Sequence, residues 1–470
     1  MRAVDVDCGG ERVPVPLPDD ATVLAYEEQP APADGAALAE AALDAPLGLP
    51  RLEALAGARP SGRGRRVVVA VDDPNRPAAT MRTLLPAVLR RLEAAGVADA
   101  EVTIVSANGM HPKFLPAALD AYLGEAVARR YRVVNHDCED GDGLVGLGRT
   151  AFGDALAYNR AAMESDLLVY VGNVAVNIWG GYSGTGVVVG LGGVESMTGH
   201  HGRGGIGHPD SCHGDPRTMH YQERKLAIHE AIERARGRPT FYVEAMTDRR
   251  GVIGAFAGEA RQVRERSWPE ADRRFVVDAP VADLVVVGLP PSLLYGSADN
   301  PLIALTGVCF PLRLWRDAPL LRPEGMVIGV TRSRNAVDPR THPGYEEAIR
   351  TFGRAGRSFE ALERAADGVG RDPGLVRVYQ AGGAYHPYHP FWLFNEDEYG
   401  MRTASRILMA GARPGELFEA LGVEVTPTVE AAWDEARRTL GARPRVVVLP
   451  AYWSRPRIAF RVADGGGARP

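Results

Sequence analysis

The chain has 470 residues, of which 45% are hydrophobic and 24% are charged, as is usual for a globular protein of two or three domains. Its formal net charge of -5 comes without a block of Lys or Arg, which argues against nucleic acid as a partner. The four cysteines are far apart and form no C-x-x-C pair, which argues against a disulfide framework and a structural zinc site.

The N-terminal stretch is acidic and lacks the apolar segment that a secretory signal peptide needs. No apolar run along the chain reaches the length of a membrane span. We therefore expect a cytoplasmic protein without a membrane partner, and the scattered cysteines agree with a reducing compartment.

The first half of the chain alternates between two kinds of pattern. Residues 1–35 suggest a strand pair and a Pro/Ala/Asp-rich connection, and residues 36–58 carry Ala and Leu at helical spacing. Short apolar runs then predict strands, and amphipathic stretches predict helices. The predicted strands are residues 65–73, 101–106, 131–135, 167–171 and 239–245, and the predicted helices are residues 83–95, 116–130 and 221–236. This alternation predicts βαβ units and a mainly parallel sheet.

A second segment of the same kind begins near residue 275. Its predicted strands are residues 284–287, 325–330, 376–380 and 446–449, with helices between them. The sequence therefore predicts an α/β fold with two α/β domains of mainly parallel sheet. We place the domains at residues 1–275 and 276–463, and we expect the last residues, 464–470, to be a disordered tail.

Polar or ionisable residues follow each of the first four predicted strands in the alternating segment. In parallel sheets, ligands bind beyond the carboxyl ends of the strands. We therefore expect four segments to meet at one cleft: residues 72–77, 108–112, 135–137 and 173–177.

Asp73 and Arg76 stand in the first of these segments. The guanidinium fork of an arginine suits a carboxylate or a phosphate, so Arg76 is well placed to hold an anionic substrate. A local Asp–Arg pair that only shapes the turn explains the same residues equally well.

Histidines follow two of the strands. His111, in GMHP, is a candidate general acid or base, or else a loop histidine that caps backbone groups. His136 precedes Asp137, which either orients it for chemistry or shares a structural role with it. His386 and His389 lie among aromatic residues in AYHPYHPFW, where packing is the usual role.

The densest cluster of glycines lies in residues 176–202, VNIWGGYSGTGVVVGLGGVESMTGHHG, with nine glycines. Glycines allow the backbone to come close to a bound molecule, and a glycine loop between a strand and a helix is a common anion site. The alternative is a loop with local turn duties alone.

Adjacent histidines, His200 and His201, close this glycine-rich stretch. Neighbouring side chains point in different directions, so only one of the two is expected to reach a given metal. A second grouping that could imitate a metal site lacks regular spacing and consists of His208, Cys212, His213 and His220.

Taken together, the motifs resemble the nickel-pincer lactate racemase family. They are DDPNRP at 72–77, GMHP at 109–112, VNHD at 134–137, GGYSGTG at 180–186, HH at 200–201 and VADLVVVGLPP at 281–291. The resemblance implies two α/β domains with the active site in the cleft between them. It also implies a nickel-pincer nucleotide (pyridinium-3,5-bisthiocarboxylate mononucleotide nickel) that is attached to a lysine and ligated by one histidine.

The reaction that this resemblance implies is racemisation or epimerisation of a small 2-hydroxy acid. Two histidines exchange the hydroxyl proton while a hydride moves to the cofactor and back. By position, Asp73 and Arg76 match the strand-end pair, and His111 matches the first proton-transfer histidine. His201 matches the nickel ligand, with His200 as the second choice. The cofactor loop matches Gly181, Tyr182, Ser183, Gly184 and Gly186.

Two positions depart from the family pattern. Asn177 replaces the second proton-transfer histidine, and Val187 replaces the lysine that carries the cofactor. Asn177 would then orient the substrate, the cofactor would be held non-covalently, and the second base would be His136 or Tyr182. Two alternatives stay open: chemistry on a hydroxy or keto acid with His111 as the single base and no nickel, or a non-catalytic homologue that binds a small molecule.

Overall fold

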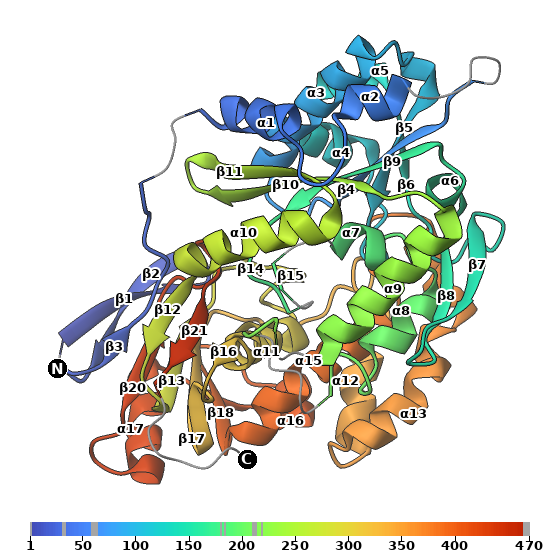
Figure 1. Ribbon diagram of the computed structural model, residues 1–470. Coiled ribbons are helices and arrows are strands. Elements are labelled where there is room, and N and C mark those ends of the chain that lie inside the picture. The colour runs from blue at the N-terminus through green and yellow to red at the C-terminus, as the bar shows by residue number, and fades with distance from the viewer. Residues whose placement is uncertain are drawn as a thin grey trace.

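The computed structural model describes residues 2–30, 34–57, 64–178, 181–182, 185–208, 214–217 and 220–463. The expected tail at 464–470 lies outside these residues. The fold is α/β, as predicted, with two six-stranded sheets and helices packed against them. In Figure 1 the sheet of the N-terminal half lies in the upper part of the view, and the sheet of the C-terminal half lies below it.

The first sheet has the strand order β11-β10-β9-β4-β5-β6. Neighbouring strands are parallel except for β10 and β11, which form an antiparallel hairpin. The strands are β4 (Val67–Asp72), β5 (Val102–Ala107), β6 (Arg132–Asn135), β9 (Leu167–Asn173), β10 (Phe241–Asp248) and β11 (Gly251–Gly258). Five of these strands agree with the sequence prediction within two or three residues.

Alternation along β4 decides which core each residue joins, because successive side chains of a strand point to opposite faces. Val67, Val69 and Val71 pack against α1, α2 and α3. Val68 and Ala70 pack on the other face, against α7, α9 and α10. The helices around this sheet are α1 (Gly35–Asp44), α2 (Leu52–Gly57), α3 (Ala78–Ala94), α4 (Pro116–Leu123), α5 (Glu125–Arg130), α6 (Arg160–Met163), α7 (Thr185–Val188), α8 (Val194–His201), α9 (His220–Arg236) and α10 (Ala260–Phe275).

The second sheet has the order β19-β18-β17-β13-β20-β3, and all its neighbouring strands are parallel. The strands are β3 (Thr22–Val23), β13 (Ala282–Gly288), β17 (Leu321–Val330), β18 (Arg406–Ala410), β19 (Glu424–Thr426) and β20 (Val446–Leu449). The helices of this half are α11 (Pro301–Cys309), α12 (Tyr345–Arg354), α13 (Phe359–Gly370), α14 (Pro373–Gln380), α15 (His389–Thr403), α16 (Glu416–Leu421) and α17 (Val429–Leu440).

The N-terminal strands lie against this second sheet, although they come first in the chain. β1 (Arg2–Cys8) and β2 (Glu11–Leu17) form the expected antiparallel pair, and β3 bonds to the edge strand β20. Val6, Val15 and Leu17 share a core with the second sheet. In Figure 1 this blue hairpin lies at the lower left, beside β13 and β20. The predicted domain limit at residue 275 coincides with the end of α10 and stays a prediction.

Shorter strand groups complete the fold. They are β7 (Leu144–Arg149) with β8 (Ala155–Asn159), β14 (Ser292–Leu293) with β15 (Gly296–Ser297), and the parallel set β12 (Val276–Ala279), β21 (Ala459–Val462) and β16 (Trp315–Arg316). Two 3-10 turns, Asp99–Glu101 and Phe310–Arg313, precede β5 and β16.

Two secondary-structure predictions need correction. Residues 376–380 were predicted as a strand and belong instead to helix α14. The side chain of Asp372 caps this helix, and Pro373 occupies its first turn, two signals that outweigh the short apolar run. The predicted helix at 116–130 is divided into α4 and α5 at Gly124, whose φ of 95° is a left-handed conformation that ends a helix.

The two halves meet at the carboxyl end of the first sheet. Tyr379 donates a hydrogen bond from its hydroxyl to the carbonyl of Gly109 (3.0 Å). The amide nitrogen of His386 donates to the carbonyl of Met110 (2.9 Å). The side-chain amide of Asn395 donates to the carbonyl of His201 (2.9 Å). These bonds hold α14 and α15 over the strand ends, where ligands are expected.

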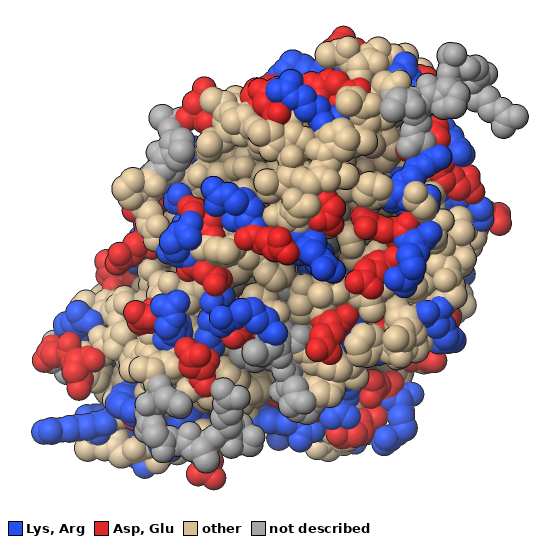
Figure 2. Space-filling model, in the orientation of Figure 1, with Lys and Arg blue, Asp and Glu red and all other residues tan. Residues whose placement is uncertain are grey.

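On the face seen in Figure 2, acidic and basic side chains are intermixed and form no large patch of one charge. The absence of a nucleic-acid partner stays a prediction. Among the described helices, none is long and apolar enough to span a membrane.

Candidate active site

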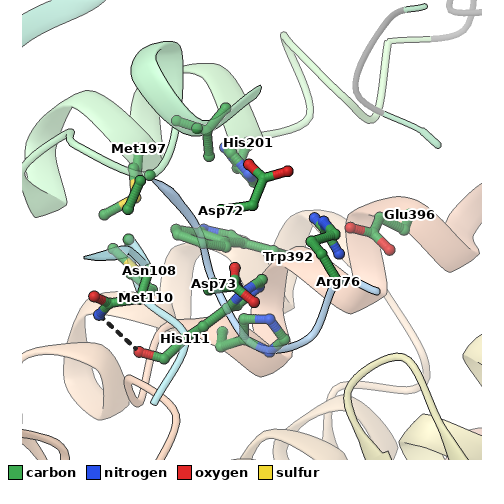
Figure 3. A pocket seen from close by; sticks show the side chains of 16 residues that line it. Asp72, Asp73, Arg76, Asn108, Met110, His111, Met197, His201, Trp392 and Glu396 are labelled. Carbon is green, nitrogen blue, oxygen red and sulfur yellow. Dashed lines mark hydrogen bonds and ion pairs between the residues drawn. The ribbon is translucent and has the colours of Figure 1, made fainter. Parts of the chain in front are cut away.

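A buried cavity lies between the carboxyl end of the first sheet and helix α15. Three groups of residues line it: the ends of β4 and β5, the segment from α7 to α8, and one face of α15 (Figure 3). The lining residues are Asp72, Asp73, Arg76, Ala107, Asn108, Gly109, Met110, His111, Gly186, Val189, Gly190, Met197, His201, His389, Trp392 and Glu396.

The end of β4 supplies two carboxylates that point in different directions, because they are consecutive residues of an extended segment. Asp72 accepts hydrogen bonds from the Tyr170 hydroxyl (2.7 Å) and from the backbone N–H of Asn173 (3.1 Å). Asp73 accepts from the backbone N–H of Asn75 (2.8 Å), and its carbonyl accepts from the N–H of Arg76 (3.0 Å). This turn directs Asp73 and Arg76 toward the cavity.

His111 is held by Asp73 across the two strand ends. Nδ1 of His111 lies 2.9 Å from a carboxylate oxygen of Asp73. Because an ionised carboxylate only accepts, Nδ1 carries the proton and Nε2 is the ring nitrogen that can accept one. The pair is mostly buried, with side-chain exposures of 13% for His111 and 7% for Asp73. The geometry is that of an oriented general base.

The two carboxylates of this turn have opposite pKa shifts. Burial alone would raise the pKa of Asp73, but the His111 imidazole, Arg76 and the Asn75 N–H together lower it below the usual value. The pKa of Asp72 is raised, because burial outweighs the stabilisation by Arg76, Tyr170 and Asn173. Asp73 is therefore the ionised partner of His111.

Arg76 presents an unsatisfied donor to this cavity. Its Nη1 is buried and has no hydrogen-bond partner within the described part of the chain. Figure 3 shows the Arg76 and Glu396 side chains turned toward one another. Burial raises the pKa of Glu396 well above its usual value, which weakens its ion pairing with Arg76. A buried guanidinium with a free donor is suited to bind a carboxylate or phosphate.

The two adjacent histidines at the end of α8 differ in position, as expected. His201 lines the cavity and packs on Trp392, with 4.2 Å between ring centroids. His200 is turned away and bonds to the Tyr221 hydroxyl (3.1 Å). The two Nδ1 atoms are 2.6 Å apart. Burial lowers the pKa of His200 to about 3 and also lowers that of His201, so both rings are neutral.

Part of the glycine-rich loop reaches the cavity. Gly186 and Gly190 line it, and a Cβ at Gly190 would stand 2.0 Å from the carbonyl oxygen of Ala107. Only glycine therefore fits where this loop crosses β5. Gly181 lies against Trp268, and the Tyr182 hydroxyl bonds to Asp272 and Arg316, away from the cavity. Ser183 and Gly184 lie outside the described residues.

Two candidate catalytic residues lie off the cavity. His136 is sealed below the strand ends: its Nε2 donates to the carbonyl of Gly192 (2.9 Å), and its Nδ1 accepts from the side chain of Asn159 (3.1 Å). Asn177 donates to the carbonyl of Ala175 (3.0 Å) and is not among the cavity residues. Val187 packs in the apolar core of α7, α9 and the first sheet.

Helix α15 supplies three cavity residues that the sequence reasoning assigned to packing or overlooked: His389, Trp392 and Glu396. Their spacing of three and four residues places them on one face of the helix. This polar and aromatic stripe, in HPFWLFNE, was the available signal. His389, for which packing was the more usual role, packs against Tyr345 and Tyr385 and also lines the cavity.

Metal ligands do not cluster in the described part of the chain: no group of three or more His, Cys, Asp or Glu side chains that could hold a metal ion is found there. Of the second grouping considered from sequence, His208 and His220 stack with ring centroids 4.0 Å apart. Cys212 and His213 lie outside the described residues. A metal at the cavity would need most of its donors from a bound cofactor, with His201 as the protein ligand.

Residues 8–214 match the family described as the lactate racemase N-terminal domain. A lactate racemase from Lactiplantibacillus plantarum is 26% identical over 223 residues, 47% of this chain and 50% of that protein. A lactate racemase from Thermoanaerobacterium thermosaccharolyticum is 25% identical over 254 residues, 52% of this chain and 55% of that protein. The sequence matches therefore span about half the length of these relatives.

Solved structures extend the likeness in fold to nearly the whole chain. The lactate racemase apoprotein from Thermoanaerobacterium thermosaccharolyticum superposes with a TM-score of 0.69 at 17% identity, covering 98% of this chain and 100% of that one. A protein from Thermotoga maritima superposes with a TM-score of 0.53 at 16% identity, covering 88% of this chain and 98% of that one. At these identities the superpositions concern the fold alone.

Proposed function

Residues 8–214 match the lactate racemase N-terminal domain, and on that premise we propose that this chain is a racemase or epimerase of small 2-hydroxy acids. The observation that carries the proposal is the grouping at the ends of β4 and β5. There, one buried cavity contains an oriented imidazole, His111, and a guanidinium with a free donor, Arg76. A 2-hydroxy acid needs both: a cation for its carboxylate and a base for its hydroxyl.

Arg76 is proposed to bind the substrate carboxylate. Its free Nη1 would gain a charge-assisted hydrogen bond on binding, which also relieves the cost of a buried unsatisfied donor. With the carboxylate fixed there, the hydroxyl of the substrate lies within the same small cavity as His111.

His111 is proposed to take the hydroxyl proton at Nε2. The Asp73 carboxylate holds the proton on Nδ1 and stabilises the imidazolium once the second proton has arrived. Trp392 and the buried strand ends exclude water from this exchange, which strengthens the charge interactions within the cavity.

The cavity residues fit a nickel-pincer nucleotide that is bound without a covalent link. His201 is a neutral imidazole at the cavity and therefore able to ligate a metal. Val187 is 1% exposed in an apolar core and offers no attachment point. When bound, such a cofactor supplies a hydride acceptor and donor for the substrate 2-carbon.

The test is racemisation by protein that is co-produced with the cofactor-synthesis enzymes. We expect one nickel per chain and a long-wavelength absorbance band. Denaturation should remove the band and leave a chain of unmodified mass, because the cofactor is not covalently attached. One member of a panel of 2-hydroxy acids, supplied as a single enantiomer, should be converted to the other enantiomer. An absence of nickel and of the absorbance band would overturn the cofactor, and an inert panel would overturn the reaction.

One observation favours a second candidate function: Asn177 and Val187 do not line the cavity. His111 would then act alone, as a base that removes a proton from carbon in a hydroxy or keto acid without nickel. Deuterated solvent distinguishes the two functions. Proton removal from carbon incorporates deuterium at the 2-carbon, whereas return of the same hydride does not.

A further inference from the structure

We propose that His389, at the start of α15, is a second catalytic residue that exchanges the hydroxyl proton of the substrate opposite His111. The proposal rests on the racemase function proposed above. The observation that carries it is the placement of two imidazoles from different halves of the chain on one cavity, with 5.3 Å between ring centroids.

The two rings are held from their outer sides by different partners. Nδ1 of His111 bonds to Asp73 (2.9 Å), and Nδ1 of His389 bonds to the Tyr345 hydroxyl (2.5 Å). In each ring, Nε2 is therefore the nitrogen left for a bound molecule. Both rings line the cavity that also holds Arg76.

Racemisation requires this kind of pairing. A substrate held by its carboxylate at Arg76 directs its hydroxyl to one side in one enantiomer and to the other side in its mirror image. One base can serve only one of these positions well, since proton transfer needs heavy atoms about 2.6–3.2 Å apart. His111 and His389 approach the cavity from opposite elements, the end of β5 and the start of α15.

The proton and electron balance closes for each half reaction. For one enantiomer, a neutral His389 accepts the hydroxyl proton at Nε2, and a protonated His111 gives a proton to the oxygen of the product; the reverse reaction exchanges these roles. A bound nickel-pincer nucleotide would accept the hydride of the 2-carbon and return it to the opposite face. The net change is inversion of one centre and transfer of one proton from His111 to His389, which proton exchange between turnovers restores.

The partner of His389 suits it to this role. A phenol hydroxyl can donate to Nδ1 or accept from it, so Tyr345 tolerates either tautomer of His389. Burial lowers the pKa of His389 well below its usual value, and the nearby His111 lowers it further. The ring is therefore neutral before substrate binds.

The other candidates for a second base are placed less well. Tyr182 bonds to Asp272 and Arg316, and His136 is sealed by Gly192 and Asn159, so neither reaches the cavity. Tyr385 packs edge-on and Tyr295 packs at a tilt near His111, but burial raises the pKa of both phenols, which makes them poor bases near neutral pH.

The experiment uses cofactor-loaded protein and the two enantiomers of the best substrate of the panel, each mixed separately in a stopped-flow instrument. The variants are His389→Asn, whose amide can keep the bond to Tyr345 while lacking Nε2, and His111→Gln. His386→Gln serves as the matched control, because His386 lies three residues away and bonds to Glu139 outside the cavity. Thermal unfolding shows that each variant is folded, and His389→Gln replaces any variant that is not.

We expect His389→Asn to lose racemisation by about 10²-fold or more in both directions. Its absorbance change on hydride transfer should survive with one enantiomer and slow by about 10²-fold with the other. His111→Gln should show the opposite preference, and His386→Gln should resemble the wild type. Calorimetric binding of a substrate analogue to cofactor-free protein should be unchanged within about threefold in His389→Asn, since proton transfer is not involved.

Two results would overturn the assignment of His389 alone: racemisation near the wild-type rate in folded His389→Asn, or equal slowing with both enantiomers. If the wild type itself fails to racemise any member of the panel, the proposed function is wrong and the role of His389 falls with it. The wild-type arm therefore separates the two failures.

Discussion

His111 and His136 lie beyond the carboxyl ends of neighbouring strands, β5 and β6, in the same sheet. His111 opens onto the cavity, and its Nδ1 is the ring nitrogen bonded within the described residues, to Asp73 (2.9 Å) with Asn75 close by (3.3 Å). Both ring nitrogens of His136 are bonded, and the side chain is 1% exposed. A polar residue at a strand end is therefore a candidate for chemistry only if a polar atom of its side chain is not already bonded within the protein. Whether such an atom stays unbonded depends on the residues that pack over the strand end.

Asn108 joins the two regions. Its side-chain amide donates to the carbonyls of His136 (3.1 Å) and His111 (3.4 Å), and its side-chain oxygen accepts from the N–H of His136 (3.1 Å). His111 and His136 thus share Asn108 as a hydrogen-bond partner. Substitutions in this area can separate an effect on the reaction from an effect on folding.

The largest expected effect is that of His111→Gln. Loss of the base should lower kcat/KM for racemisation by about 10²- to 10⁴-fold. The free energy of unfolding should fall by about 1–3 kcal/mol, because the buried Asp73 carboxylate loses its partner. Chiral chromatography of the product and denaturant unfolding measure the two quantities. Equal activity in the variant would show that His111 is not the base.

His136 should control stability instead, through pH. Burial lowers its pKa to about 4, whereas an unfolded histidine titrates near 6.5. Between these pH values the unfolded chain binds a proton that the folded chain does not, so stability falls as pH falls from about 7 toward 4. The contribution of His136 is about 3 kcal/mol over that window.

Denaturant unfolding at several pH values tests this contribution by comparing the wild type with His136→Gln. The variant should lose less stability on acidification than the wild type, although it starts from a lower value at neutral pH. Its racemisation, corrected for the folded fraction, should stay close to that of the wild type. A parallel pH dependence in the two proteins would contradict the structural role.

Asp73→Asn should have an intermediate effect on the reaction. An asparagine amide can donate to Nδ1 of His111, which favours the tautomer with the proton on Nε2 and removes the base from the cavity. We expect kcat/KM to fall by about 10- to 100-fold, and we expect a shift in the pH at which activity rises. A pH–rate profile of wild type and variant measures both. An unchanged profile would show that Asp73 does not orient the base.

The smallest expected effect is that of Asn108→Ala, which removes the hydrogen bonds that link Asn108 to His111 and His136. Leaving the backbone groups of His111 and His136 without this partner should cost about 1–2 kcal/mol of stability. Activity should fall only a few-fold, because Asp73 still holds the His111 ring. Unfolding and racemisation assays on one preparation compare the losses. A loss of activity as large as that of His111→Gln would show that Asn108 is needed to position His111.

Much of this architecture could be predicted from the sequence, because it depends on local patterns. Apolar runs located the strands of the first sheet, and the rule for strand ends brought Asp73, Arg76 and His111 to one place. The glycine-rich stretch and the paired histidines pointed to the same cavity, where Gly186, Gly190 and His201 lie. The expected convergence of four strand ends held only for two, since His136 is sealed and Asn173 bonds to Asp72 instead.

Only the tertiary structure decided what faces these strand ends. The residues opposite His111 come from α15, more than 270 positions later in the chain, and no local pattern specifies which helix of the second half packs there. The packing of α15 over β5 turned His389 from an apparent packing residue into a neighbour of the base. Sequence periodicity determines which face of an element is polar, whereas the burial of the other faces determines what that polar side meets.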